Sequence, residues 1–281
     1  MFRAWIPIFC ALCACSDATP REPSAEIRRV VSLLPSFTEI VVALQRADTL
    51  VGCTEAGRPG RSDVARLPWR PPIESVIRLS PDVVLRQKGR AENDALRTQL
   101  EAAGVRVVAI PSETIADVQR AITEIGELLD ASEKAGEINA RFDRDLEAVR
   151  ASVAGKRRPC VLFVFGRDQG AAANVRAAGP NTFLDELVTL AGGRNVLADL
   201  DQPYPDVSLA DLVRRKPEVI IDNLPAEKNI AAVRAAWSRL KPVPAVRDGK
   251  IHAVFDRDLL IPGPRLPAGL ARLAKMIHGE D

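Results

Sequence analysis

Short apolar runs rich in β-branched residues alternate along this chain with longer segments whose apolar residues recur every three or four positions. The short runs predict buried strands, and the longer segments predict amphipathic helices. Predicted strands cover residues 29–34, 50–53, 82–86, 105–110, 160–165, 219–222 and 250–254. Predicted helices cover residues 37–45, 73–79, 91–103, 114–130, 182–191, 208–215, 230–238 and 267–278. This order of strands and helices is typical of an α/β fold with parallel sheets.

A longer amphipathic segment separates the two halves of the chain. Within residues 131–154 the apolar positions from Ile138 to Val149 recur at spacings of three and four, which predicts one long helix. The halves also resemble each other, because residues 73–85 and 209–221 both contain a short helical pattern, a proline, an acidic residue and an apolar strand. We therefore predict two lobes, each a parallel sheet with helices on both faces, joined by one long rigid helix that permits only small lobe movements.

The clearest local signal is a strand that stops at a proline and turns directly into a helix. Val30 to Leu34 is a short apolar run, and Pro35 cannot donate to a sheet ladder. Ser36 and Glu39 have the spacing of a capping box, which predicts Ser36 as the N-cap of the helix. Such a junction directs free backbone N–H groups out of the carboxyl end of a sheet, where open α/β folds bind ligands.

The N-terminus has the pattern of a targeting segment. Arg3 supplies a positive charge before an apolar stretch, and Leu12-Cys13-Ala14-Cys15 resembles a bacterial lipobox with cleavage before Cys15 and lipid on its thiol. The alternative is a secretory signal cut near Ala14 or Ala18. The predicted divisions are a signal peptide, a tether, an N-terminal lobe, a linker helix and a C-terminal lobe, at residues 1–14, 15–27, 28–130, 131–156 and 157–281.

Composition narrows the class of protein. The chain is 47% hydrophobic with a mean hydropathy of −0.02, as expected of a globular protein. Its formal net charge is +2 and the charges are dispersed, which argues against a nucleic-acid footprint. No apolar run reaches the ~18 residues that a membrane-spanning helix needs.

Motifs of several enzyme classes are absent. The sequence contains no GxGxxG, P-loop, GxSxG or HExxH pattern. His252 and His278 lack partners at metal-ligand spacing, so we predict no metal site. Cys53 and Cys160 are interpreted as small buried residues, because a disulfide between them would lock the two halves together. An enzyme on the same α/β scaffold remains an alternative.

Candidate ligand-binding residues follow the predicted strands, since the carboxyl ends of strands in open α/β folds face the binding crevice. Trp69 and Tyr204 each lie in a proline-rich loop, and they are the rings on which a planar ligand would stack. The alternative for both rings is surface packing against the neighbouring prolines. The other predicted positions are Pro35, Ser36, Glu55, Gln87, Lys88, Phe165, Arg167, Asp258 and Arg265.

Three stretches carry a resemblance to a known family. The run Arg29–Ile40, the segment Glu74–Val83 and the sequence Pro262-Gly263-Pro264-Arg265 resemble the class III periplasmic binding proteins of ABC importers, and most closely their cobalamin-binding branch. The resemblance covers nearly all of the chain from residue 28 onward. It implies a monomeric receptor, not an enzyme, that is lipid-anchored on the periplasmic face and passes a corrinoid to a membrane permease. It implies no resident cofactor.

The chain also departs from that branch. Two positions that usually hold aromatic residues of the binding cleft in that branch correspond to Ala56 and Gln87 in this chain. A corrin ring would therefore contact fewer aromatic side chains than usual. The alternative ligands are a ferric siderophore held by Arg167 and Lys88, or haem with Tyr204 as its axial ligand. A lipoprotein that binds only another protein is a further alternative.

The resemblance also implies how the receptor docks. In the family, an acidic residue on each lobe pairs with arginines of the transporter, and Glu74 matches the acid of the first lobe. The matching position in the second lobe is Ala210, which carries no charge. Asp211 is the neighbouring candidate for this role, although on a helix it faces about 100° away.

Overall fold

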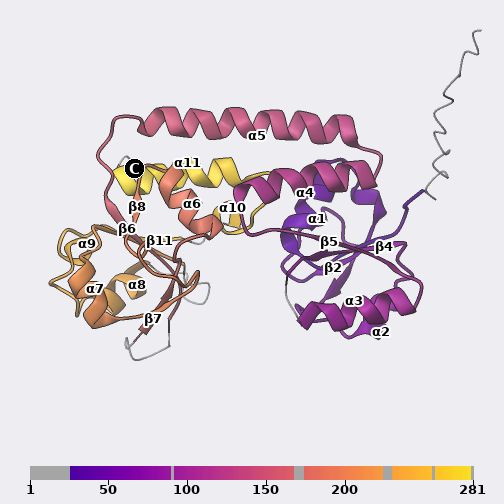
Figure 1. Cartoon of the computed structure of the whole chain (residues 1–281), viewed down its shortest axis with the longest axis horizontal. Helices are drawn as coiled ribbons and strands as arrows, with labels where there is room; N and C mark the ends of the chain where they lie inside the picture. The colour runs from indigo at the N-terminus through magenta and orange to yellow at the C-terminus, as the bar shows by residue number, and fades with distance from the viewer. Residues whose placement is uncertain (1–25, 90–91, 168–173, 224–229, 255–256, 280–281) are drawn as a thin grey trace, which may run out of the picture.

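The computed structural model describes residues 26–89, 92–167, 174–223, 230–254 and 257–279. It contains two α/β lobes bridged by one long helix (Figure 1). The N-lobe runs from strand β1 to helix α4, and the C-lobe from strand β6 to helix α11. The predicted two-lobed α/β fold is confirmed.

The N-lobe is built on one parallel sheet with the strand order β3-β2-β1-β4-β5. Its central strands β1 and β4 are almost completely buried, as the apolar runs Val30–Val31 and Val83–Leu85 predict. The strands are β1 Val30–Ser32, β2 Leu50–Thr54, β3 Ala65–Leu67, β4 Val83–Gln87 and β5 Arg106–Ile110. The helices are α1 Pro35–Ala43, the 3₁₀ turn η1 Ala47–Thr49, α2 Ile73–Ile77, α3 Glu92–Ala102 and α4 Ile115–Leu128.

The C-lobe sheet is mixed, which the sequence did not predict. Its strand order is β11-β10-β6-β7-β9, with β8 also paired to β6, and β7 is antiparallel to both β6 and β9. The strands are β6 Cys160–Arg167, β7 Asn174–Ala177, β8 Arg194–Asn195, β9 Asp206–Ser208, β10 Val219–Asp222 and β11 Ile251–Ala253. The helices are α6 Phe183–Leu190, α7 Leu209–Arg215, α8 Ile230–Trp237, α9 Pro244–Arg247, α10 Arg257–Leu260 and α11 Leu266–His278.

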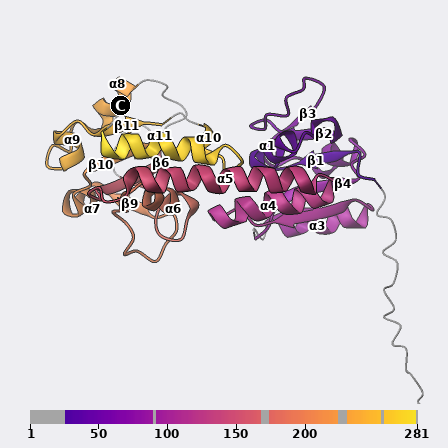
Figure 2. The same cartoon turned by 90° about the horizontal axis from the view of Figure 1, so that it is seen from above.

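Helix α5, Ser132–Val153, spans both lobes and lies beside the C-terminal helix α11 (Figures 1 and 2). One cluster of buried apolar side chains continues from Val30 and Phe37 of the N-lobe through Phe142 of α5 to Phe163 and Leu270 of the C-lobe. Because separating the lobes would expose part of this shared core to water, small lobe movements are favoured over wide opening. In the part of the chain that the structure describes, no helix has the length and apolarity of a membrane span.

The start of helix α1 corrects one prediction. The helix begins at Pro35, its N-cap is Leu34, and no side chain caps it. Proline at the first helical position has its φ angle preset and lacks the N–H that a cap would otherwise serve. Ser36 therefore lies inside the first turn, and Glu39 is too far along the helix to form the predicted capping box.

Candidate functional site

A cavity of about 290 Å³ lies between the two lobes. Its N-lobe wall comes from residues at or just beyond the ends of strands β1, β3, β4 and β5, as the topology of open α/β sheets predicts. The N-lobe contributes Leu34, Pro35, Ser36, Trp69, Gln87, Ser112 and Glu113. The C-lobe contributes Phe183, Tyr204, Leu260, Ile261 and Pro262. We call this space the cleft cavity.

Aromatic rings from both lobes line the cleft cavity. Trp69 of the N-lobe is 54% exposed and Tyr204 of the C-lobe is 39% exposed, although both are large apolar side chains. Phe165, at the end of β6, supports the Tyr204 ring edge-to-face, with 5.2 Å between the ring centroids and 81° between the planes. Such contacts hold a ring in place while its other face stays open. The arrangement suits a flat, largely apolar ligand.

The polar groups of the cleft cavity are mostly uncharged. The Gln87 amide donates to the Glu113 carboxylate at 2.6 Å, which fixes both side chains at the cavity wall. The Ser36 hydroxyl is buried and has no hydrogen-bond partner among the described residues. An unsatisfied buried hydroxyl favours a ligand that offers a hydrogen bond. Glu113 is the carboxylate among the described lining residues, and no cationic side chain lies among them.

Other predicted site residues lie elsewhere. Glu55 is exposed and does not line the cleft cavity. Lys88 lines a separate cavity along strand β5, together with Arg86, Arg97 and Arg106. The backbone of Arg167 ends strand β6, and its side chain lies outside what the structure describes.

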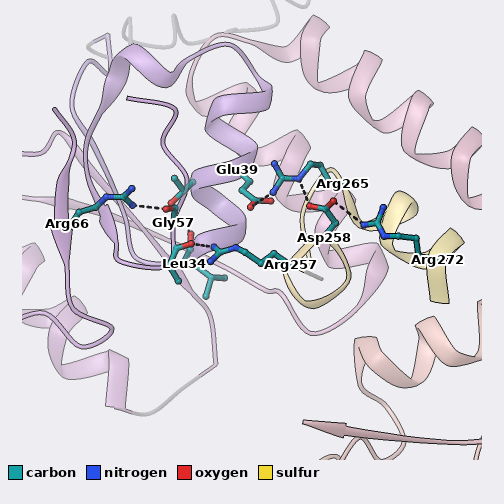
Figure 3. A network of polar contacts seen from close by, with 10 residues as sticks. Leu34, Glu39, Gly57, Arg66, Arg257, Asp258, Arg265 and Arg272 are labelled. Carbon is teal, nitrogen blue, oxygen red and sulfur yellow. Dashed lines mark hydrogen bonds and ion pairs between the residues drawn. The ribbon is translucent and has the colours of Figure 1, made fainter. Parts of the chain in front are cut away.

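Asp258 and Arg265 belong to an ion-pair network that crosses between the lobes (Figure 3). Arg265, the N-cap of α11, donates to Glu39 of α1 at 2.6 Å and to Asp258 of α10 at 2.8 Å. Arg272 of α11 donates to the other oxygen of Asp258 at 3.1 Å. We call these four side chains the seam network. Two of the stretches that carried the family resemblance, Arg29–Ile40 and Pro262–Arg265, thus meet in one contact between the lobes.

Glu39 is the buried member of the seam network. Burial raises the pKa of its carboxyl, and the positive charges of Arg265, Arg58 and Arg257 oppose that shift without cancelling it. Desolvation therefore outweighs ion pairing at this position. Arg265 is 44% exposed and retains Asp258 as a second partner. Breaking the ion pair would therefore affect its two members unequally. Water can solvate the partly exposed Arg265, whereas the buried Glu39 carboxylate depends on Arg265.

Two further contacts connect the lobes. The backbone N–H of Ile115, at the start of α4, donates to the Glu186 carboxylate of α6 at 2.7 Å. Arg257 of α10 donates to the backbone carbonyl of Ala56 in the loop after β2. These contacts join the start of α4 and the loop after β2 to helices of the C-lobe, so they help to set the separation of Trp69 and Tyr204.

Several lining residues were missed from the sequence. Ser112 and Glu113 follow strand β5, and the rule that selected residues after the other strands would have found them. Phe183 begins α6, and Leu260 ends α10, a helix that was not predicted. Their apolar side chains gave no signal that separated them from core residues.

The two predicted docking residues differ in their surroundings. Glu74 is exposed on α2. Asp211 accepts a hydrogen bond from the Ser208 hydroxyl at 2.6 Å and pairs with Arg214. The docking role of both residues stays a prediction. Among the described residues no group of three or more potential metal ligands is found.

Two α/β lobes with a cavity between the carboxyl ends of their sheets define a bilobed binding protein that holds a small molecule between its lobes. Residues 30–253 match the family described as periplasmic binding protein, and the chain belongs to this family, in its class III. Members are substrate-binding transport proteins and not enzymes, as the sequence predicted.

Similar proteins agree with this assignment. The chain is 28% identical to a cobalamin-binding protein of Halobacterium salinarum, over 90% of this chain and 70% of the relative. It is 27% identical to an uncharacterised ABC transporter substrate-binding lipoprotein of Bacillus subtilis, over 91% and 81%. A periplasmic haem-binding protein from Pseudomonas aeruginosa superimposes with a TM-score of 0.78 at 27% identity, over 90% and 93%.

The chain is thus an exported substrate-binding protein of the ABC type. Its partners are a small-molecule ligand and a membrane permease.

Proposed function

We propose that this protein binds cobalamin or a related corrinoid in the cleft cavity and delivers it to the permease of an ABC importer. The observation that carries the proposal is the lining of the cavity, which combines aromatic rings from both lobes with uncharged hydrogen-bonding groups. A corrin ring is flat and apolar on its faces, and its edge bears neutral amides. Trp69 and Tyr204 would contact the faces, while Ser36 and Gln87 would bond the amides.

The charge of the lining favours a corrinoid over the two alternatives. Haem carries two carboxylates, and many ferric siderophores carry net negative charge. No cationic side chain among the described lining residues is available to pair with such groups, and Glu113 would repel them. Lys88, one of the two residues predicted to hold a siderophore, faces a different cavity. The relative from Halobacterium salinarum, described as cobalamin-binding, supports the same choice.

A corrinoid is larger than the cleft cavity. Sites for drug-sized ligands measure about 300–1,000 Å³, and the cavity lies at the lower end of that range. Binding would therefore keep part of the ligand at the open mouth and widen the space between the lobes by a small movement about α5. The shared apolar core and the seam network limit this movement.

Membrane attachment and docking complete the proposed function. Lipid on Cys15 would hold the receptor at the membrane, with residues 16–27 as a tether, and stable anchoring would need more than one acyl chain. Glu74, exposed on α2, would pair with a cationic residue of the permease.

Calorimetry with a panel of ligands tests the proposal. The purified protein is titrated with cyanocobalamin, with haem and with a ferric catecholate siderophore, which carries the negative charge that the lining disfavours. Ile77→Ala is the matched control, because Ile77 is another exposed large apolar residue and lies outside the cleft cavity. The proposal predicts one cyanocobalamin per chain, with the same affinity in the control. Tight binding of haem or the siderophore, with no heat from cyanocobalamin, would reject the corrinoid and identify that compound as the ligand.

A further inference from the structure

The outer end of the C-lobe gathers cations that are far apart in the sequence. Strands β8, β6, β10 and β11 are parallel neighbours in the C-lobe sheet, and their first residues stand nearly level in the register. Because neighbouring strands lie about 4.8 Å apart, the four starting points span only about 15 Å. We call this end of the lobe the C-lobe pole. It is formed by residues 156–159, 192–194, 216–218 and 241–250.

Backbone hydrogen bonds join the segments of the C-lobe pole. The N–H of Arg194 donates to the carbonyl of Pro159 at 2.9 Å, which joins the starts of β8 and β6. The N–H of Ala245 donates to the carbonyl of Pro217 at 3.0 Å, which joins α9 to the start of β10. Figures 1 and 2 show α9 at the end of the molecule farthest from the N-lobe. The pole is therefore one continuous surface that faces away from the N-lobe.

Five exposed cations of the C-lobe pole have no acidic partner among the described residues. Arg158 donates to a backbone carbonyl and Arg194 to a cysteine sulfur, so neither guanidinium charge is compensated. The other three are Lys216, Lys241 and Lys250, whose side chains form no hydrogen bond or ion pair with a described residue. Uncompensated charge of one sign is thus concentrated on this surface.

The acids of the C-lobe pole are already paired. Glu218 forms an ion pair with Arg157, and Asp248 forms one with Arg247 at 2.8 Å. Each pair contributes no net charge, so these acids leave the five other cations unopposed. A negatively charged partner would therefore meet five positive charges across this surface.

The corresponding end of the N-lobe has no such excess. The four residues before each strand that pairs in parallel contain, in total, four bases and four acids in the N-lobe. The same segments of the C-lobe contain seven bases and two acids. The excess therefore belongs to one lobe and not to strand starts in general, although the whole chain has a formal net charge of only +2.

An anionic bilayer is the partner that this surface fits. The chain is an exported protein, so it meets lipid headgroups and not the nucleic acids of the cytoplasm. The five cations come from separate loops and are exposed, so they respond to charge density and not to the shape of one small ligand. A layer of phosphate headgroups supplies such a density, and each nearby lysine or arginine strengthens binding to it.

We propose that the C-lobe pole binds the phosphate headgroups of an anionic bilayer. Such binding requires neither the corrinoid nor the permease, so it goes beyond the proposed function. Figures 1 and 2 show the start of the described chain at the end of the molecule opposite α9. With lipid on Cys15, the receptor would thus touch the membrane at both ends of its long axis. A basic patch is one of the second signals that make attachment by an acyl chain stable.

Flotation with lipid vesicles tests this assignment. The chain is prepared from residue 15 with Cys15→Ala, so that neither the predicted leader nor an acyl chain contributes to binding. One set of vesicles is phosphatidylcholine alone, and the other contains equal parts of phosphatidylcholine and phosphatidylglycerol. No importer and no corrinoid is present, so the outcome is independent of the transport function. The pole variant combines Lys216→Gln, Lys241→Gln and Lys250→Gln, which remove charge without breaking a hydrogen bond to a described residue.

A second triple variant separates the C-lobe pole from the total charge of the protein. This control combines Arg106→Gln, Arg144→Gln and Lys275→Gln, which remove the same charge from exposed sites on β5, α5 and α11. Melting temperatures equal to that of the parent chain verify that both variants fold.

We expect the parent chain to bind the vesicles that contain phosphatidylglycerol and not those of phosphatidylcholine alone. The pole variant should bind more weakly by about tenfold or more, because each cation near an anionic surface contributes up to about fivefold. The control should bind within about threefold of the parent chain, since charges farther away than a Debye length are screened, and high salt should release the parent chain and the control alike.

Three results would overturn the proposal. They are the absence of binding to the anionic vesicles, equal binding of the two triple variants, and equal binding to both kinds of vesicle. Binding only to vesicles that also contain the purified importer would likewise reject the lipid surface and assign the C-lobe pole to a protein partner.

Discussion

Removing Arg265 should destabilise the protein much more than removing the charge of Glu39. Arg265→Met leaves the Glu39 carboxylate buried without its nearest cation. Loss of one partner of a buried ion pair costs about 3–5 kcal/mol. Because Arg257 and Arg58 also attract Glu39, we expect the smaller value of about 2 kcal/mol. Glu39→Gln leaves an amide oxygen for Arg265 and removes the desolvated charge, so we expect a change within about 1 kcal/mol.

The two effects should also differ in their pH dependence. The pKa of Glu39 is raised in the folded protein, so the folded state binds its proton more tightly than the unfolded state does. Stability from this group is therefore fully present below the unfolded pKa and is lost as the pH rises through the folded pKa. In Arg265→Met the pKa of Glu39 rises further, because the largest opposing charge is gone. The deficit relative to wild type should thus be greatest at neutral pH and shrink in acid.

Urea unfolding at pH 7.5 and at mildly acidic pH measures both effects, for wild type, the two single variants and the double variant. Each variant is compared with wild type at the same pH, since paired acids such as Asp199 lower the stability of every variant in acid. The double variant should lie close to Glu39→Gln alone, because no buried carboxylate remains to be left unpaired. An equal loss for both single variants, or a deficit of Arg265→Met that does not change with pH, would refute this account of the seam network.

Three other predictions concern binding, localisation and transport. Trp69→Ala and Tyr204→Ala should each weaken corrinoid binding by about 1 kcal/mol in calorimetry, the size of a stacking contact, and unchanged affinity would remove the rings from the site. Cys15→Ala should move the protein into the soluble fraction of fractionated cells; unchanged membrane partitioning would argue against the lipid anchor. Glu74→Ala should leave ligand affinity and melting temperature unchanged but reduce uptake, and wild-type uptake would reject its docking role.

Elements with buried apolar sequences were predictable. The strand predicted at residues 219–222 is β10, because a strand covered on both faces contains a continuous apolar run, here Val219 to Ile221. Strand β7 was missed because only alternate residues of Asn174–Ala177 are buried. It contains Arg176, and its antiparallel pairing depends on neighbours distant in sequence. Such strands lack the continuous apolar pattern that marks the parallel ones.

The candidate site was predictable in part. Trp69 and Tyr204 could be selected because large rings in proline-rich loops offer surfaces on which a planar ligand can stack, and both line the cleft cavity. The role of Arg265 could not be read from the sequence, because its partner Glu39 lies 226 positions away. Local spacing favoured a capping box for Glu39, and only the packing of the two lobes reveals the competing ion pair.

The absorption spectrum of the protein purified from its own host shows whether the space between the lobes holds a corrinoid. Corrinoids, haem and ferric siderophores absorb at different wavelengths, so a ligand that copurifies identifies itself. We expect corrin bands in the spectrum of the wild-type protein, and weaker bands in that of Trp69→Ala. A Soret band of haem, or the charge-transfer band of a ferric siderophore, would contradict it.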